Sequence, residues 1–239
     1  AGKQPTGQRG SYQEVIFHPH MAEFRRRNEA ISLHMVTFVA PEADVHIRHI
    51  TVTNEGDETV HIGLTSYGEV VLAPSDADRR HQAFAKLFVE TEILDEMPGL
   101  LFQRRPRSAN EPPTCLVHML VYGPGAADDN LGPTMRLADR AHFIGRTGTP
   151  RAPAALQDGG WWEIDPKTES GATLDPVMAL GQEIQLDGHA SAQLAYVTIR
   201  GSSRAEVMSI ANSHSSWNAL QRARSRAQSQ MRREMHQLG

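Results

Sequence analysis

The sequence has only one cysteine, Cys115, so it cannot form a disulfide bond within the chain. A lone thiol is compatible with a reducing compartment. Cys115 alternates with Val117, Met119 and Val121, which is the period of a β-strand with one buried face. We therefore expect Cys115 to be a buried strand residue and not a nucleophile.

Long apolar runs and an excess of basic charge are also missing. No apolar segment approaches the roughly 20 residues that a membrane-spanning helix requires, and the first residues lack the apolar core of a signal peptide. The formal net charge is −4, which gives no reason to expect nucleic acid as a partner. We therefore expect no contact with nucleic acid and no contact of this segment with a membrane.

What the sequence does contain is a two-residue apolar period, which runs from residue 13 to residue 200. Turn sequences such as Pro98-Gly99 and Asp187-Gly188 separate the alternating runs. Strands at this spacing, without helical periods between them, predict an all-β, antiparallel sandwich.

Two details of this pattern carry local predictions. The apolar parity changes between residues 45–47 and residues 50–52, which indicates a β-bulge near His49. The segment 51–62 has the turn sequence NEGDE between two alternating runs, which predicts a β-hairpin.

Residues 201–239 change to a helical period. Ser203 and Glu206 fit a capping box, and apolar residues recur at helical spacing from about Trp217, which predicts an amphipathic helix resting on the sandwich. The expected division is a linker (1–12), a β-sandwich domain (13–200) and one or two C-terminal helices (201–239). The polar connections 73–85 and 128–151 are expected to be long loops.

Residues that could catalyse a reaction or bind a metal do not form a recognisable site. The densest histidine groups, His18–His20 and His46–His49, lack the spacing of a zinc site. Paired carboxylates could act as acid and base on a glycoside. However, the pairs Glu90/Glu92 and Asp76/Asp78 fall on a solvated strand face and in a loop, without the burial that raises a catalytic pKa. The sequence predicts no catalytic residue, no metal site and no cofactor.

Six residues are candidates for contact with a substrate or another domain: Arg104, Arg105, Arg107, Arg146, Trp161 and Trp162. Indole rings stack on the apolar faces of sugars, but packing in the core or between domains is the alternative for the tryptophan pair. Guanidinium groups bind sugar hydroxyls or the acids of a neighbouring domain. Because Pro106 interrupts the strand, we interpret the arginines as a surface-facing set. In this chain alone they should be exposed, apart from local pairs with Glu111 or Asp139.

Four segments, in this order, carry a family resemblance: SYGEVVLAPSDADRRHQAFAKLFVETE (66–92), QRRPRS (103–108), FIGRTGTPRAPAAL (143–156) and GATLDPVMAL (171–180). From about Tyr12 to the C-terminus, the chain resembles the β-sandwich of the transglycosylating segment of cyclic β-1,2-glucan synthases. It is more distantly similar to the sandwich of the cellobiose-phosphorylase-like enzymes of glycoside hydrolase family 94. Residues 161–169 depart from the family pattern, in which a shorter Gly/Thr-rich link is usual.

The resemblance implies a β-supersandwich that precedes a helical (α/α) barrel, with residues 201–239 as the linker toward that barrel. It implies a non-catalytic, carbohydrate-associated domain, inactive by itself, that supports the barrel in which β-1,2-glucan is transglycosylated. The barrel of the same polypeptide would be its partner. The implied parent is anchored in a bacterial inner membrane, with this segment on the cytoplasmic side.

Two other functions stay open. A freestanding carbohydrate-binding module, with β-glucan as its ligand, would need an aromatic platform, for which only Trp161 and Trp162 are available. A purely structural domain that contacts other domains would fit the arginines and the lack of catalytic residues.

Overall fold

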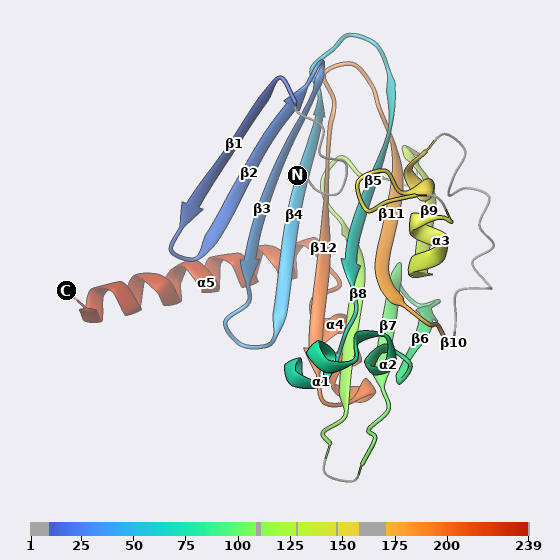
Figure 1. Ribbon diagram of the computed structural model, residues 1–239. Coiled ribbons are helices and arrows are strands. Elements are labelled where there is room, and N and C mark those ends of the chain that lie inside the picture. Colours follow the sequence, from blue (N-terminus) through green and yellow to red (C-terminus); the bar gives the residue numbers. More distant parts are fainter. Residues whose placement is uncertain (1–9, 109–110, 128, 147, 158–170, 239) are drawn as a thin grey trace.

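The computed structural model describes residues 10–108, 111–127, 129–146, 148–157 and 171–238. Two antiparallel sheets lie face to face, and two C-terminal helices cover part of the outer face of the larger sheet (Figure 1). The predicted fold class, an antiparallel β-supersandwich with C-terminal helices, is confirmed.

The larger sheet has the strand order β1-β2-β3-β4-β12-β8-β7-β6-β10. Its strands are β1 (Tyr12–His18), β2 (Met21–Asn28), β3 (Ile31–Val39), β4 (Val45–Asn54), β6 (Val89–Leu94), β7 (Gly99–Arg104), β8 (Thr114–Tyr122), β10 (Gly171–Ala172) and β12 (Ser191–Gly201). The smaller sheet, ordered β5-β11-β9, consists of β5 (Val60–Glu69), β9 (Leu131–Asp139) and β11 (Pro176–Leu186).

Helices occupy the connections and the C-terminal part of the described chain. They are α1 (Ser75–Arg80), α2 (Gln82–Lys86), α3 (Arg140–Ile144), the 3-10 helix η1 (Ala154–Leu156), α4 (Arg204–Ser213) and α5 (Trp217–Leu238). None of the helices in the described ranges is long and apolar enough to cross a membrane. At the start of α4 the Ser203 hydroxyl accepts a hydrogen bond from the Glu206 amide at 3.2 Å, as predicted. The Glu206 carboxylate instead accepts one from the Ser202 amide at 2.8 Å, so the box is offset by one residue.

The centre of the larger sheet is buried on both faces, and β4 contributes residues to the apolar cluster on each face. Val45 and Ile47 pack in the cluster beneath α4 and α5, whereas Ile50 and Val52 pack in the cluster between the sheets. Because β4 pairs regularly with β3 and β12 along its length, the bulge predicted near His49 is wrong. The parity change arises because the two halves of the strand bury opposite faces.

The predicted hairpin over residues 51–62 is also wrong. Both edges of β4 are occupied by β3 and β12, so β5 crosses to the smaller sheet and pairs with β11. Asn54 fixes this crossing and is fully buried. Its Nδ2 donates to the carbonyls of Glu58, Leu186 and Asp187 at 2.7, 3.2 and 3.0 Å, and its Oδ1 accepts from the Gly56 amide at 3.0 Å.

Residues 128–151 were expected to be a loop, but most of this segment has regular structure. β9 forms an edge of the smaller sheet, where Pro133 is tolerated because only one side of the strand pairs. Met135 and Leu137 are buried in a small cluster with Phe143 of α3. The prediction that Cys115 is a buried strand residue is confirmed.

Candidate functional site

Arg104 ends β7 and lies inside the protein, with only 3% of its surface exposed. Its Nε donates to Glu111 at 2.9 Å and its Nη1 donates to the Ala85 carbonyl at 2.6 Å. The guanidinium lies 5.5 Å from the centre of the Phe88 ring. The expectation of an exposed Arg104 is therefore wrong, although the predicted local pair with Glu111 is present. The side chain holds α2 and the β7–β8 connection together.

Arg105 and Arg107, in contrast, are exposed. Arg105 forms an ion pair with Glu90 at 3.1 Å. The Arg107 guanidinium lies over two aromatic rings, 4.9 Å from the centre of Phe84 and 5.3 Å from that of Phe88. Its backbone amide donates to Glu111 at 2.7 Å, and this hydrogen bond is the main reason that the pKa of the Glu111 carboxyl is lowered. Arg105 and Arg107 thus face solvent, and neighbouring side chains hold each of them in place.

Arg146 lies on a different element, the exposed connection that follows α3. Trp161 and Trp162 lie outside the described residues. Near α3, a charged network that was not predicted from the sequence joins four segments. Lys86 of α2 contacts Asp175 at 2.5 Å and Glu69 at 3.6 Å, and Arg140 contacts the same two acids at 3.3 Å (Glu69) and 3.7 Å (Asp175).

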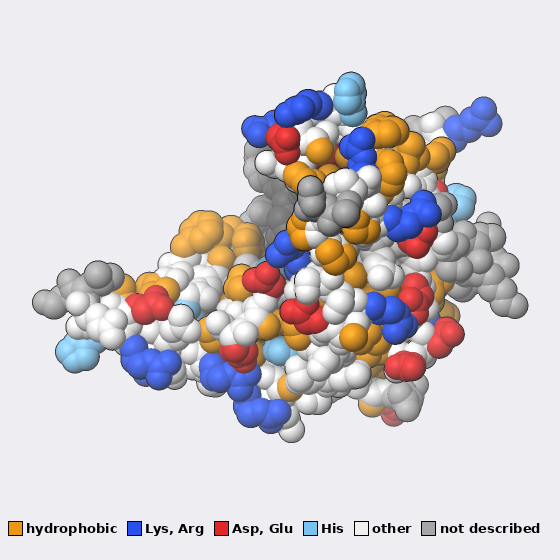
Figure 2. Space-filling view, turned by 90° about the horizontal axis from the view of Figure 1, so that it is seen from below, with side chains coloured by type: hydrophobic (Ala, Val, Ile, Leu, Met, Phe, Trp, Pro, Cys, Tyr) orange, Lys and Arg blue, Asp and Glu red, His pale blue; other side chains and the backbone are white. Residues whose placement is uncertain are grey.

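The end of the sandwich that carries α1 and the β7–β8 connection therefore has charges of both signs. Figure 2 views the molecule from this end and shows basic and acidic side chains interleaved, with apolar side chains between them. Among the apolar side chains of α2 and its C-cap, Phe84 is 46% exposed and Leu87 is 42% exposed. A mixed surface of this kind resembles the rim of a protein–protein interface.

Three of the four carboxylates weighed as catalytic pairs form surface ion pairs, whereas Asp78 has a buried oxygen without a hydrogen-bond partner among the described residues. Glu90 pairs with Arg105, Glu92 pairs with Arg204 at 2.6 Å, and Asp76 pairs with Arg80 at 3.1 Å. Asp76 lies on α1, not in the loop that was expected. Exposed pairs of this kind lack the burial that a general acid at neutral pH requires.

A serine and a histidine do lie within hydrogen-bond distance, but between the sheets. His118 Nε2 is 2.8 Å from Ser66 Oγ, and His118 Nδ1 is 2.9 Å from Thr198 Oγ1. Burial is the main cause that lowers the pKa of His118 to about 3. Ser66 is only 3% exposed and His118 is completely buried, so no substrate can reach them. The group links the two sheets, and its residues were not singled out from the sequence.

Histidines also meet a carboxylate on the outer face of the larger sheet. His18 Nε2 and His34 Nε2 each lie 3.1 Å from an oxygen of Glu23, and Arg25 approaches the same carboxylate at 3.2 Å. No group of three His, Cys, Asp or Glu side chains arranged to hold a metal ion occurs in the described part of the chain.

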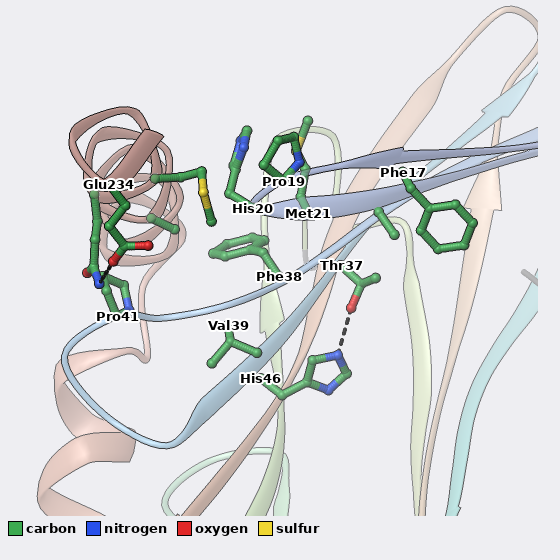
Figure 3. Close-up of a pocket in the computed structure, with 14 residues that line it drawn as sticks. Phe17, Pro19, His20, Met21, Thr37, Phe38, Val39, Pro41, His46 and Glu234 are labelled. Atoms are coloured by element: carbon green, nitrogen blue, oxygen red, sulfur yellow. Dashed lines mark hydrogen bonds between the residues drawn. The ribbon is translucent and has the colours of Figure 1, made fainter. Parts of the chain in front are cut away.

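An apolar groove of about 500 Å³ lies where α5 passes the ends of β1–β4. Figure 3 shows residues of the β1–β2 turn on one side, Val39 and Pro41 on the other, and Glu234 of α5 at its end. Phe17 is 80% exposed and Val39 is 59% exposed at this groove. The sequence pattern did not reveal the groove, because it forms only where the helix meets the sheet.

Comparisons with known proteins place these features in a family. The family described as glycosyl hydrolase 94, supersandwich domain, matches residues 1–216. The chain is 28% identical over 204 residues to the cyclic beta-(1,2)-glucan synthase NdvB of Rhizobium meliloti (strain 1021). This match covers 85% of the chain but only 7% of that relative, so the chain corresponds to a small part of its length.

Solved structures with similar folds include a putative kojibiose phosphorylase from the human microbiome and a polysaccharide lyase. The phosphorylase has a TM-score of 0.46 and 8% identity, and the match covers 89% of this chain and 23% of that one. The lyase has a TM-score of 0.41 and 13% identity, with 77% and 22% covered.

Proposed function

The chain belongs to the glycosyl hydrolase 94 supersandwich family, and we propose that it is the non-catalytic sandwich module of a cyclic β-1,2-glucan synthase-like enzyme. In this proposal, it supports a helical barrel of the same polypeptide that transglycosylates β-1,2-glucan. The parent enzyme would be anchored in a bacterial inner membrane, with this module on the cytoplasmic side. The match to the glucan synthase over 85% of the chain supports the assignment of the parent.

The observation that carries the proposal is the division of α5 into two parts. Leu220, Ala223 and Ala227 are at most 8% exposed and pack on the larger sheet. Beyond Ala227 the helix continues past the sandwich (Figure 1), and Met235 is 57% exposed. The first half of the helix suffices to cover the sheet. The second half, together with the groove beside it, offers apolar surface that suits contact with another domain.

The proposed absence of catalysis rests on the state of the candidate groups. Glu90, Glu92 and Asp76 pair with arginines at the surface, and the Ser66–His118 pair is sealed between the sheets. Arg105, Arg107 and Arg146 remain candidates for contact with the barrel or with glucan, because their side chains are exposed. Arg104 is withdrawn from this set because it is buried.

The test is a pair of substitutions in the parent enzyme. Val39→Glu and Met235→Glu place a charge in or beside the groove and should lower glucan cyclisation while leaving the thermal unfolding of the isolated chain unchanged. Ser229→Glu, on an exposed face of the same helix, is the matched control and should change neither. Full cyclisation by both groove variants would contradict the contact.

The isolated chain provides the second test. Incubated with UDP-glucose, or with linear β-1,2-glucan with and without phosphate, it should yield no product. Turnover that is lost when an acid of the chain is replaced would overturn the non-catalytic assignment.

A further inference from the structure

A second groove, of about 460 Å³, lies on the outer face of the larger sheet, on the same face as α5. The strand register shows how it is built. The neighbouring residues in one row across β1, β2, β3, β4 and β12 are Tyr12, Arg27, Ser32, Thr53 and Ser191. The next row consists of Glu14, Arg25, His34, Thr51 and Gln193. Ten polar side chains thus share one face of five strands.

The helices leave these two rows open. In the following row, β3 and β4 contribute Val36 and His49, and the His49 ring stacks on Trp217 with their centres 4.6 Å apart. Trp217 also lies so close to Gly123 that a Cβ there would come within 2.6 Å of the indole. The start of α5, at Trp217, therefore forms the boundary of the groove beside His49. The residues that line the groove come from β1 to β4 and from Glu55, which follows β4. With strands about 4.8 Å apart, these four strands span about 14 Å, enough for two or three sugar rings.

We propose that this groove binds a neutral oligosaccharide. Its side chains supply hydroxyls, guanidinium groups, carboxylates and an imidazole, all of which hydrogen-bond to sugar hydroxyls. Tyr12 is 50% exposed at one end of the rows and offers an aromatic face for a sugar ring. The choice of glucan as the ligand rests on the proposed function, whereas the preference for a neutral polyhydroxylated ligand comes from the groove itself.

The charges of the groove disfavour an anionic ligand. Arg25 contacts Glu14 at 3.4 Å and Glu23 at 3.2 Å, and Arg27 contacts Glu55 at 2.6 Å. These guanidinium groups are therefore already neutralised by carboxylates on the same face. A polyanion would have to displace those carboxylates, but a neutral sugar can use the remaining hydrogen-bonding positions.

Hydrogen bonds among its side chains also distinguish the groove from an ordinary solvated sheet face. The Ser32 hydroxyl donates to Glu55, the Thr53 and Ser191 hydroxyls are 2.8 Å apart, and the Arg27 Nε donates to the Glu29 carbonyl at 3.1 Å. Side chains fixed in this way lose little conformational entropy when a ligand binds.

The experiment is a calorimetric titration of the chain with a linear β-1,2-gluco-oligosaccharide, with dextran sulfate as the anionic probe. We expect saturable binding of the neutral glucan that depends little on salt. Tyr12→Ala and Thr51→Lys should each weaken it about tenfold or more. Gln13→Ala and Asn28→Ala change exposed residues of the same strands on the opposite face, and they should leave binding unchanged.

Several results would overturn the proposal: no binding of the neutral glucan, binding of dextran sulfate only, or equal affinity in the groove and control variants. The proposal would also be overturned if the ligand shifted amide NMR signals only at the apolar groove of Phe17, Val39 and Glu234. These outcomes would not affect the proposed role in supporting the barrel, because that role is tested separately by Val39→Glu and Met235→Glu. Conversely, turnover of glucan by the isolated chain would contradict the proposed function without removing the binding groove.

Discussion

Two buried imidazoles should make the domain lose stability in mild acid. His49 lies beneath α5, stacked on Trp217 and edge-on to Phe38, and burial is the main cause that lowers its pKa to about 4. His118 lies between the sheets, where burial lowers its pKa to about 3. Both rings are neutral in the folded protein, and both gain a proton more easily when the chain unfolds.

The sign and size of the effect follow from this difference. Between the unfolded pKa near 6.5 and the folded values, the unfolded chain binds more protons, so the free energy of unfolding falls as the pH falls. From pH 6.5 to about pH 4.5, each ring contributes a loss of about 2 kcal/mol, because the full slope of about 1.4 kcal/mol per pH unit is reached only below the unfolded pKa. Together they remove about 4 kcal/mol, a large part of the whole stability of many domains.

Carboxylates contribute little to the change in the free energy of unfolding between pH 6.5 and 4.5. The pKa values of Glu23, Glu111 and Glu206 are lowered from 4.5, with hydrogen bonds from neighbouring groups among the causes. Their contribution to stability is complete above the unfolded value and is lost only as the pH falls further. The interval between pH 6.5 and pH 4.5 therefore isolates the histidines.

His49→Phe is the informative substitution. The phenyl ring keeps the contacts with Trp217 and Phe38 and removes His49 Nε2, a buried nitrogen without a hydrogen-bond partner among the described residues. At pH 7 the variant should be as stable as the parent chain or about 1 kcal/mol more stable, since an unsatisfied buried polar atom costs that order of free energy. Its loss of stability between pH 6.5 and 4.5 should be smaller by about 2 kcal/mol, the share of His49. The contributions of His118, and of His20 and His46, whose pKa values are also lowered, remain.

The assay is urea unfolding followed by far-UV circular dichroism at pH 7, 5.5 and 4.5. Val117→Ala is the control in the same cluster, because Val117 aligns with Val45, four positions along β4 from His49. It should lower stability equally at each pH, since it removes packing but no titrating group. The reasoning fails if His49→Phe loses as much stability in acid as the parent chain. It also fails if the variant is less stable by several kcal/mol at pH 7, which would mean that the imidazole has a polar role.

Two further substitutions test local structure. Asn54→Ala should destabilise the domain by about 3 kcal/mol in urea unfolding, because it leaves the buried carbonyl groups at the β4–β5 crossing without their donor. Asn28→Ala, at the exposed end of β2, is the control, and a loss below about 1 kcal/mol at Asn54 would contradict the account. Arg104→Ala should cost about 3 kcal/mol because it strands the Glu111 carboxylate, whereas Arg105→Ala, which removes an exposed pair, should cost less than about 1 kcal/mol; equal losses in the two variants would refute this distinction.

The sequence predicted the sandwich, its C-terminal helices and the buried Cys115, because period two and period 3.6 are local signals of burial. Which strands pair with each other was harder to predict from the sequence. The turn after Asn54 looks like that of a hairpin, but pairing depends on whether the edge of β4 is free, and β12, more than a hundred residues later, occupies that edge. Local pattern cannot report a competition with so distant a strand.

The candidate residues show the same limit. Arg104, Arg105 and Arg107 look equivalent in sequence, yet only Arg104 turns inward, because Glu111 and the Ala85 carbonyl are placed to receive it. The polar groove was missed for a related reason. Its rows consist of single residues from five strands, and no stretch of sequence brings Tyr12, His34 and Ser191 together.

The parity change in β4 links the fold to both proposed roles. Where Val45 and Ile47 face outward, α5 covers the sheet and then continues toward the surface proposed to meet the barrel. Thr51 and Thr53 lie beyond the start of α5, where the outer face of the sheet is uncovered and open to the proposed ligand. The boundary is the stack of Trp217 on His49. The parity change that suggested a bulge near His49 thus marks where the outer face changes from a packing surface to a proposed binding surface.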